Sequence, residues 1–237
     1  MVDIARKVIA VSGATGNLGA ACVTAGLAAG ARIAALGRSK AALERQFPDA
    51  ASDPHILLLD GVDLEEVWSV DAALARTVDR FGGLDAVMNT VGGFAMGRIA
   101  GDSFDTWSAM QAINVQTAFT LTRAAIPLLQ QRGGGSIVHV AALAGLASAP
   151  GLSAYAASKA AVLRLVEAAA AEHRSDCIRV NAVMPGTIDT PQNREAMPDA
   201  DVSKWVSPAA IADAMLMLAG DHARAVTGAA IPVTGPS

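Results

Sequence analysis

Cysteine is scarce in this sequence of 237 residues. Only Cys22 and Cys177 are present, far apart and without a CxxC motif. This excludes a disulfide framework and a thiolate metal centre, both of which need paired cysteines. We therefore expect both cysteines to be small buried residues in a reducing compartment. No metal site is expected either, because the histidines, His55, His139, His173 and His222, lack metal-ligand spacing.

Long apolar runs and runs of like charge are also missing. Stretches long enough to span a membrane are interrupted, as by Gly145, Pro150 and Gly151 in the alanine-rich segment 141–157. The few residues before the apolar run at Val8 leave no room for a signal peptide. The net charge is -4 and lysine and arginine do not cluster, which argues against a nucleic-acid surface. We expect a soluble, cytoplasmic protein that binds neither nucleic acid nor membranes.

The chain contains no repeat, low-complexity linker or break in composition. Short apolar, β-branched runs alternate with longer helical patterns, as in parallel sheets built from βαβ units. Strands are predicted at 8–12, 32–36, 56–59, 86–89, 136–140, 179–183 and 230–233. Helices are predicted at 17–29, 41–46, 64–81, 104–131, 153–172 and 208–220. The fold class is α/β: one Rossmann-type domain over 1–237, with a doubly wound parallel sheet of about seven strands and helices on both faces.

A glycine-rich segment, Ser12-Gly13-Ala14-Thr15-Gly16-Asn17-Leu18-Gly19, separates the first predicted strand from the first predicted helix. Glycine lets the backbone turn sharply and approach a pyrophosphate, while the helix N-terminus presents N–H groups to its charge. The placement indicates dinucleotide binding, and a purely structural turn is the alternative. The candidate residues are Gly13, Thr15, Gly16, Asn17, Leu18 and Gly19.

No acidic residue follows the second predicted strand, where the chain reads Leu36-Gly37-Arg38-Ser39. A carboxylate there would bind the ribose 2′-hydroxyl and repel a 2′-phosphate, whereas an arginine does the reverse. Arg38 and Ser39 therefore favour NADP(H), with NAD(H) still possible. In the alternative interpretation, Arg38 covers the adenine ring or points into solvent.

Two further segments lie at predicted strand ends, where ligands bind in such sheets. Asp63 and Leu64 follow the third strand and are placed to meet the adenine. Asp63 is also a favoured residue for a helix N-cap. Asn89 and Gly92 end the fourth strand and complete the expected cofactor edge.

Tyr155 and Lys159 lie four residues apart in a predicted helix, and therefore on the same face. A free phenol has a pKa of about 10. A fixed ammonium group and a positive nicotinamide ring would favour the phenolate and lower that pKa. Tyr155 is thus a candidate proton donor to a carbonyl or imine that receives a hydride.

The ordered set Gly13/Gly16/Gly19, Asn89-Thr90-Val91-Gly92, Asn114, Tyr155-x-x-x-Lys159 and Pro185-Gly186 resembles the short-chain dehydrogenase/reductase family over the whole chain. The resemblance implies that Tyr155 is the catalytic acid/base and that Lys159 lowers its pKa and holds the nicotinamide ribose. It implies that Asn114 holds a water for proton relay. It also implies that Pro185, Gly186, Ile188 and Thr190 meet the nicotinamide carboxamide, through the Ile188 backbone and the Thr190 hydroxyl.

One departure concerns the substrate carbonyl. The family places a serine thirteen residues before the tyrosine, and this sequence has Ala142 there. Alanine offers no hydrogen bond, so the usual polarising donor is missing. His139 or Ser148 is a candidate replacement, although His139 also suits a strand residue packed beneath the site.

A second departure is the glycine spacing, G-x-x-G-x-x-G in place of the common G-x-x-x-G-x-G, a variant shared with extended nucleotide-sugar epimerases. Quinonoid dihydropteridine reductases are the branch that looks most similar. They share this spacing, lack the serine and have an aromatic residue that resembles Phe94 after Gly92-Gly93. They differ in resembling NADH users, with an aspartate near the position of Gly37-Arg38.

We therefore expect an NAD(P)H-dependent oxidoreductase acting on a carbonyl, quinonoid or imine group of a small organic substrate. One alternative is a pterin reductase, and another is a weakly catalytic NADP-binding sensor or assembly protein. Residues 187–206 are predicted to form a substrate lid, with apolar walls from Pro191, Met197, Pro198 and Trp205. Alanine-rich helix faces predict a homodimer or homotetramer, because small residues allow close helix packing.

Overall fold

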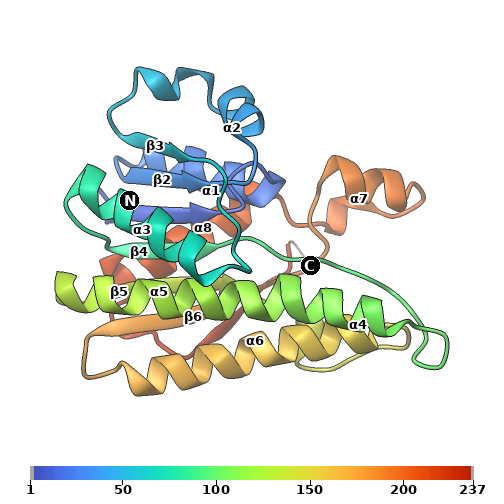
Figure 1. Ribbon diagram of the computed structural model, residues 1–237. Coiled ribbons are helices and arrows are strands. Elements are labelled where there is room, and N and C mark those ends of the chain that lie inside the picture. The colour runs from blue at the N-terminus through green and yellow to red at the C-terminus, as the bar shows by residue number, and fades with distance from the viewer. Residues whose placement is uncertain (1–2, 236–237) are drawn as a thin grey trace.

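The computed structural model describes residues 3–235. Seven parallel strands form one sheet with the spatial order β3-β2-β1-β4-β5-β6-β7 (Figure 1). The strands are β1 (Val8–Ser12), β2 (Arg32–Leu36), β3 (Ile56–Leu59), β4 (Ala86–Asn89), β5 (Gly135–Val140), β6 (Ile178–Pro185) and β7 (Ala230–Val233). The strand order reverses between β1 and β4, which creates a crevice at their carboxyl ends. The predicted doubly wound α/β fold is confirmed.

Helices cover both faces of the sheet. On one face α3 (Val67–Phe81), α5 (Thr117–Arg132) and α6 (Ser153–Glu172) pack over one apolar core. On the other face α1 (Asn17–Ala28) and α8 (Pro208–Ala219) bury a second core. All five residues of β1 are buried, which explains why the strand is a continuous apolar run rather than an alternating one.

Two helices end at glycine residues that adopt a left-handed backbone conformation. Gly82 ends α3 with φ 81°, and Gly133 ends α5 with φ 85°. This left-handed backbone favours glycine because a Cβ atom would crowd the adjacent carbonyl.

Three predicted segments differ from the structure. The single helix predicted over 104–131 is divided into α4 (Phe104–Met110), a π-helical turn η2 (Gln111–Gln116) and α5. The helix predicted from residue 64 begins at Val67, because residues 64 and 65 form a turn and Glu66 is extended. The loop expected over 190–205 contains α7 (Pro191–Ala196), because the Thr190 side chain accepts a hydrogen bond from the Asn193 N–H and Pro191 suits the first turn.

The remaining short elements lie in the connections between the strands and the longer helices. They are α2 (Lys40–Gln46), η1 (Pro48–Ala51), η3 (Leu143–Gly145), η4 (Val202–Lys204) and η5 (Asp221–Ala223).

Within residues 3–235, no helix is both long and apolar enough to cross a bilayer.

The two cysteines differ in environment. Cys22 is fully buried in α1, as expected. Cys177 is exposed, so the expectation that it is buried is wrong. It occupies a left-handed turn between α6 and β6, with φ 57°, and this turn holds its side chain at the surface.

Candidate functional site

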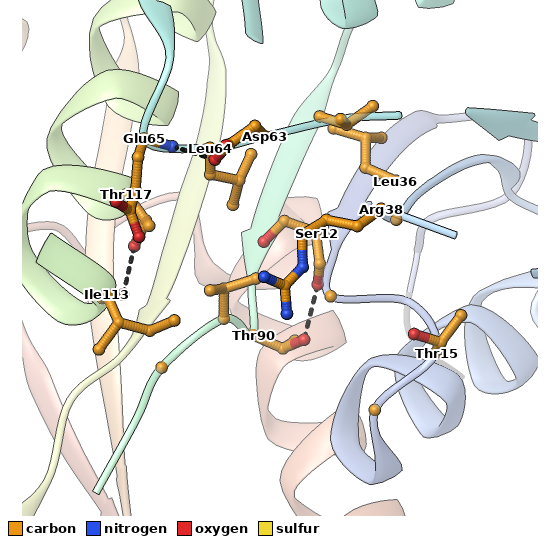
Figure 2. A pocket seen from close by; sticks show the side chains of 16 residues that line it. Ser12, Thr15, Leu36, Arg38, Asp63, Leu64, Glu65, Thr90, Ile113 and Thr117 are labelled. Atoms are coloured by element: carbon orange, nitrogen blue, oxygen red, sulfur yellow. Dashed lines mark hydrogen bonds between the residues drawn. The ribbon is translucent and has the colours of Figure 1, made fainter. Parts of the chain in front are cut away.

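A cleft opens at the carboxyl ends of β1, β2 and β4, where the strand order reverses (Figure 2). Seven of the predicted cofactor residues line it: Gly13, Thr15, Gly16, Arg38, Asp63, Leu64 and Gly92. Its other walls are Ser12, Leu36, Gly37, Val62, Glu65, Thr90, Val91, Ile113 and Thr117.

The glycine loop is shaped for close approach of a ligand. Gly16 precedes α1 without any side-chain cap, so N–H groups of the first helical turn remain available to an anion. A Cβ atom on Gly19 would lie 2.1 Å from the Gly13 carbonyl oxygen, so the helix and loop pack together only around glycine. These features fit a dinucleotide pyrophosphate.

Two loop residues have other contacts. Leu18 packs into the core beneath the loop. The Asn17 amide donates a hydrogen bond of 2.8 Å to Gln192 in α7, which joins the glycine loop to the predicted lid. Neither residue lines the cleft.

Arg38 extends its guanidinium group into the cleft (Figure 2). Within residues 3–235 its side chain forms no ion pair with an acid, so its charge is not neutralised by the protein. The neighbouring Ser39 caps α2 instead, because its hydroxyl accepts a hydrogen bond from the Ala42 N–H. Arg38 is thus a cationic side chain at the cleft, available to an anionic group of a ligand.

Residues 63–65 form the wall opposite the glycine loop. Asp63 does not cap α3. Its carboxylate accepts the Glu65 N–H at 3.0 Å and orders a local turn. Thr120 and Gln116 donate hydrogen bonds to the Leu64 and Glu65 carbonyls, which holds this wall against α5.

Lys159 lies beneath the catalytic end of the cleft and is 4% exposed. Its ammonium group donates a 2.9 Å hydrogen bond to the Val140 carbonyl and lies 5.9 Å from the centre of the Tyr155 ring. Burial lowers the pKa of Lys159 to about 8. Burial raises the pKa of Tyr155, so in this geometry the expected lowering of the phenol pKa by Lys159 is not present.

Asn114 occupies the π-helical turn and is buried. Its side chain accepts the Gly93 N–H at 3.0 Å and donates to the Gly93 carbonyl at 3.1 Å. It also donates to Ser158, whose hydroxyl donates to the Tyr155 carbonyl. Asn114 therefore links the Gly92-Gly93 wall to the helix that carries Tyr155 and Lys159.

Gly92 lies close to the side chains of both Asn114 and Lys159. A Cβ atom there would lie 2.9 Å from the Asn114 Oδ1 and 3.0 Å from the Lys159 Nζ. The close packing brings Asn114 and Lys159 together at the cofactor cleft, next to Tyr155 on α6.

A buried polar network supports the strand ends. The Asn89 carboxamide accepts a 2.6 Å hydrogen bond from Ser12 and contacts His139 at 3.3 Å, so it faces the sheet rather than the cleft. The other His139 ring nitrogen lies 2.9 Å from the Thr122 hydroxyl, which itself donates to Ala118. His139 is fully buried, and burial together with Lys159 lowers its pKa to about 4. It is a neutral packing residue with both ring nitrogens engaged.

The position of the missing serine is apolar. Ala142 is 7% exposed at the end of β5. The exposed Ser148 contacts the Ala149 carbonyl. Phe94 approaches Tyr155 edge-on, with 4.9 Å between ring centroids, and is 61% exposed.

The predicted carboxamide residues follow β6. Gly186 is packed against the backbone of Thr234, and Ile188 pairs with Val206 to close the base of the predicted lid. Pro185 ends β6, and Thr190 caps α7. These residues do not line the described cleft.

Sequence reasoning missed several walls of the cleft, including Glu65, Ile113 and Thr117. Glu65 directly follows the predicted Asp63 and Leu64, so its position carried a signal. Ile113 and Thr117 come from η2 and the start of α5, which carry no nucleotide motif and reach the cleft through packing of the chain. The position of Thr90 had a signal, since it lies between Asn89 and Gly92. Its hydroxyl donates to the Ser12 carbonyl at 2.6 Å and joins β4 to β1.

The model of the short chain dehydrogenase family matches residues 7–201, and the chain belongs to this family. Its members are NAD(P)(H)-binding oxidoreductases, which agrees with the glycine loop and the cleft.

Curated relatives match over nearly the full length. The chain is 34% identical to 2-(R)-hydroxypropyl-CoM dehydrogenase of Xanthobacter autotrophicus, covering 97% of both chains. It is 31% identical to 2,5-dichloro-2,5-cyclohexadiene-1,4-diol dehydrogenase of Sphingobium indicum, covering 98% of this chain and 96% of that protein. Among solved structures, L-sorbose reductase of Gluconobacter frateurii, complexed with NADPH and L-sorbose, has a TM-score of 0.89 at 25% identity, with coverage of 99% and 97%.

Proposed function

We propose that the protein is an NADP(H)-preferring oxidoreductase that reduces a carbonyl, quinonoid or imine carbon of a small organic substrate. The observation that carries this proposal is the joint packing of Asn114 and Lys159 around Gly92, beside Tyr155 and next to the Arg38 cleft. The NADPH-bound sorbose reductase and the curated dehydrogenases support the same chemistry.

A bound reduced nicotinamide would supply the hydride. Tyr155 would donate its hydroxyl proton to the substrate oxygen or nitrogen as the hydride reaches the adjacent carbon. Lys159 would hold the ribose and favour the phenolate that remains, and a positive nicotinamide adds to this effect. Asn114 would fix the Gly93 wall and support a water that returns a proton to Tyr155. The carboxamide would meet Pro185, Gly186, Ile188 and Thr190, while the segment 187–206 would cover the substrate.

The test of this mechanism is Tyr155→Phe, which retains the ring and its contact with Phe94 but removes the acid. Turnover should fall on the order of a hundred- to ten-thousand-fold. NADPH affinity and the unfolding midpoint should remain close to those of the wild type. Undiminished turnover in stopped-flow measurements of NADPH oxidation would refute the assignment of Tyr155.

A second candidate is a weakly catalytic NADP-binding sensor or assembly protein. Ala142 favours it, because no hydroxyl polarises a substrate carbonyl at that position. A 30% identical relative from Xanthobacter autotrophicus is described as an inactive 2-(S)-hydroxypropyl-CoM dehydrogenase. NADPH binding without turnover of quinones, diketones or quinonoid dihydropterin would favour this candidate.

A pterin reductase is the narrower version of the first proposal. A quinonoid ring needs less carbonyl polarisation, so Ala142 suits it, and Phe94 offers an exposed aromatic face beside Tyr155. Turnover of quinonoid dihydropterin well above that of simple quinones would support it.

A further inference from the structure

A second cleft lies at the opposite edge of the sheet, where the strands begin. It is lined by residues before β1, β4 and β7, at the start of β5 and β6, and after α5, α6 and α8. It encloses about 590 Å³, within the range of small-molecule sites. None of its lining residues belongs to the cofactor cleft.

Positive charge is concentrated in this cleft although the protein is acidic. Five of the fifteen lining residues are cationic and two are acidic: Lys7, Arg132, Arg174, Arg179 and Arg224, with Asp85 and Asp221. The formal charge of the lining is therefore 5 − 2 = +3. The whole chain has 18 lysines and arginines among 237 residues and a net charge of -4. The cleft thus has the opposite sign to the rest of the surface and would attract anions.

Three of the five cations have partners in the protein. Lys7 pairs with Asp221 at 2.8 Å, and Arg132 pairs with Asp85 at 2.7 Å. Arg179 donates to the Leu218 and Gly220 carbonyls at the end of α8. These contacts neutralise both acids and satisfy helix-terminal carbonyls, so little negative charge remains to repel an anion.

Arg174 and Arg224 are the two cations left over. Both are exposed, and within residues 3–235 neither side chain forms an ion pair or hydrogen bond. Arg174 precedes β6 and Arg224 follows η5 before β7, and both line the same cleft. Two planar guanidinium groups can each donate paired hydrogen bonds to the multiply charged oxygens of a phosphate.

We propose that this cleft binds a small phosphorylated metabolite through Arg174 and Arg224, at a site separate from the cofactor cleft. The volume of the cleft exceeds that needed for a single ion, and the pairing of Lys7 and Arg132 with acids leaves Arg174 and Arg224 available to a ligand.

Cys177 provides a reporter for this site because its exposed thiol lines the same cleft. The other thiol, Cys22, is fully buried, and burial raises its pKa to about 12, so it will not compete. The experiment follows the reaction of Cys177 with neutral 4,4′-dithiodipyridine while inorganic pyrophosphate is added at constant ionic strength. Saturable slowing of at least threefold is expected.

The double variant Arg174→Gln/Arg224→Gln should lose this protection. The matched control, Arg45→Gln/Arg76→Gln, removes the same charge from exposed arginines outside the cleft and should keep it. No slowing in the wild type, or equal slowing in both variants, would overturn the proposal. Protection by polyglutamate but not by pyrophosphate would also overturn it, in favour of an acidic protein partner.

Discussion

At the scale of a single residue, we expect Arg38 to set the proposed preference for NADP(H). Its guanidinium enters the cleft without a carboxylate partner in the described part of the chain. A charge-assisted contact with a 2′-phosphate is worth about 2 kcal/mol, so Arg38→Ala should weaken NADPH binding roughly thirtyfold. NADH binding should change little. Isothermal titration calorimetry with both cofactors measures these affinities. If NADPH and NADH binding weaken equally, Arg38 does not bind the 2′-phosphate.

Ala142 occupies the position of the family's serine, and we expect it to affect which substrates are reduced. Ala142→Ser would place a hydroxyl where the family polarises the substrate carbonyl, and the small side chain differs from alanine by one atom. Ketone reduction should rise about tenfold, while quinonoid substrates, which need less polarisation, should change little. The ratio of kcat/KM for the two substrate classes is the measurement. An unchanged ratio would mean that the site does not depend on a donor at this position.

Lys159 makes stability depend on pH. Its pKa is about 8 in the folded protein and 10.5 in its ordinary state, because burial disfavours the ammonium. Between these values the unfolded chain binds the extra proton, so the free energy of unfolding rises with pH. The rise attributable to Lys159 is roughly 3 kcal/mol.

Denaturant unfolding from pH 7.5 to 10 should show this rise as a difference between the wild type and Lys159→Met. Cys22, whose pKa is raised by burial, titrates in both proteins and cancels in the difference. Tyr155 lies beside Lys159 and would titrate differently in the variant, so both proteins carry Tyr155→Phe in this comparison. Parallel pH profiles for the two proteins would contradict the prediction.

At the scale of helices and strands, the elements that depend on neighbouring residues in the sequence were predicted correctly. The seven strands follow from their apolar runs, and the ends of α3 and α5 follow from Gly82 and Gly133. The sequence did not predict the π-helical turn within residues 104–131 or the later start of α3, because both depend on residues that are distant in the chain. Asn114 lies in the π-helical turn and holds Gly93, 21 residues earlier in the chain. The turn before α3 is held by Gln116 of η2 and Thr120 of α5, which lie 51 and 56 residues after their partners.

The same distinction applies to the candidate site. Tyr155, Lys159 and the glycine loop were predictable because each motif is short and the motifs occur in a recognisable order. The inward orientation of Asn89 was not, since it depends on Ser12 and His139 from neighbouring strands. His139 illustrates the same point: only the packed sheet shows that both of its ring nitrogens are engaged.

At the scale of the whole molecule, the helices α4, α5 and α6 offer a surface for self-association. Ala156 and Ala169 are buried within the chain, whereas Ala157, Ala160, Ala161 and Ala168 are partly or fully exposed. Phe104 and Phe119 add exposed apolar area on α4 and α5. We expect a homodimer or homotetramer at micromolar concentration by light scattering, and a monomeric mass would contradict this.

The packing of Tyr155 between Phe94 and Lys159 has a consequence for spectroscopy. Tyrosine occurs once in the chain, so the ultraviolet absorption of tyrosinate arises from this phenol alone. Difference spectra recorded during a pH titration therefore report the protonation of the proposed catalytic group directly, without a label or a substitution. The same signal, followed as NADP⁺ is added, would measure how far a positive nicotinamide counteracts the effect of burial.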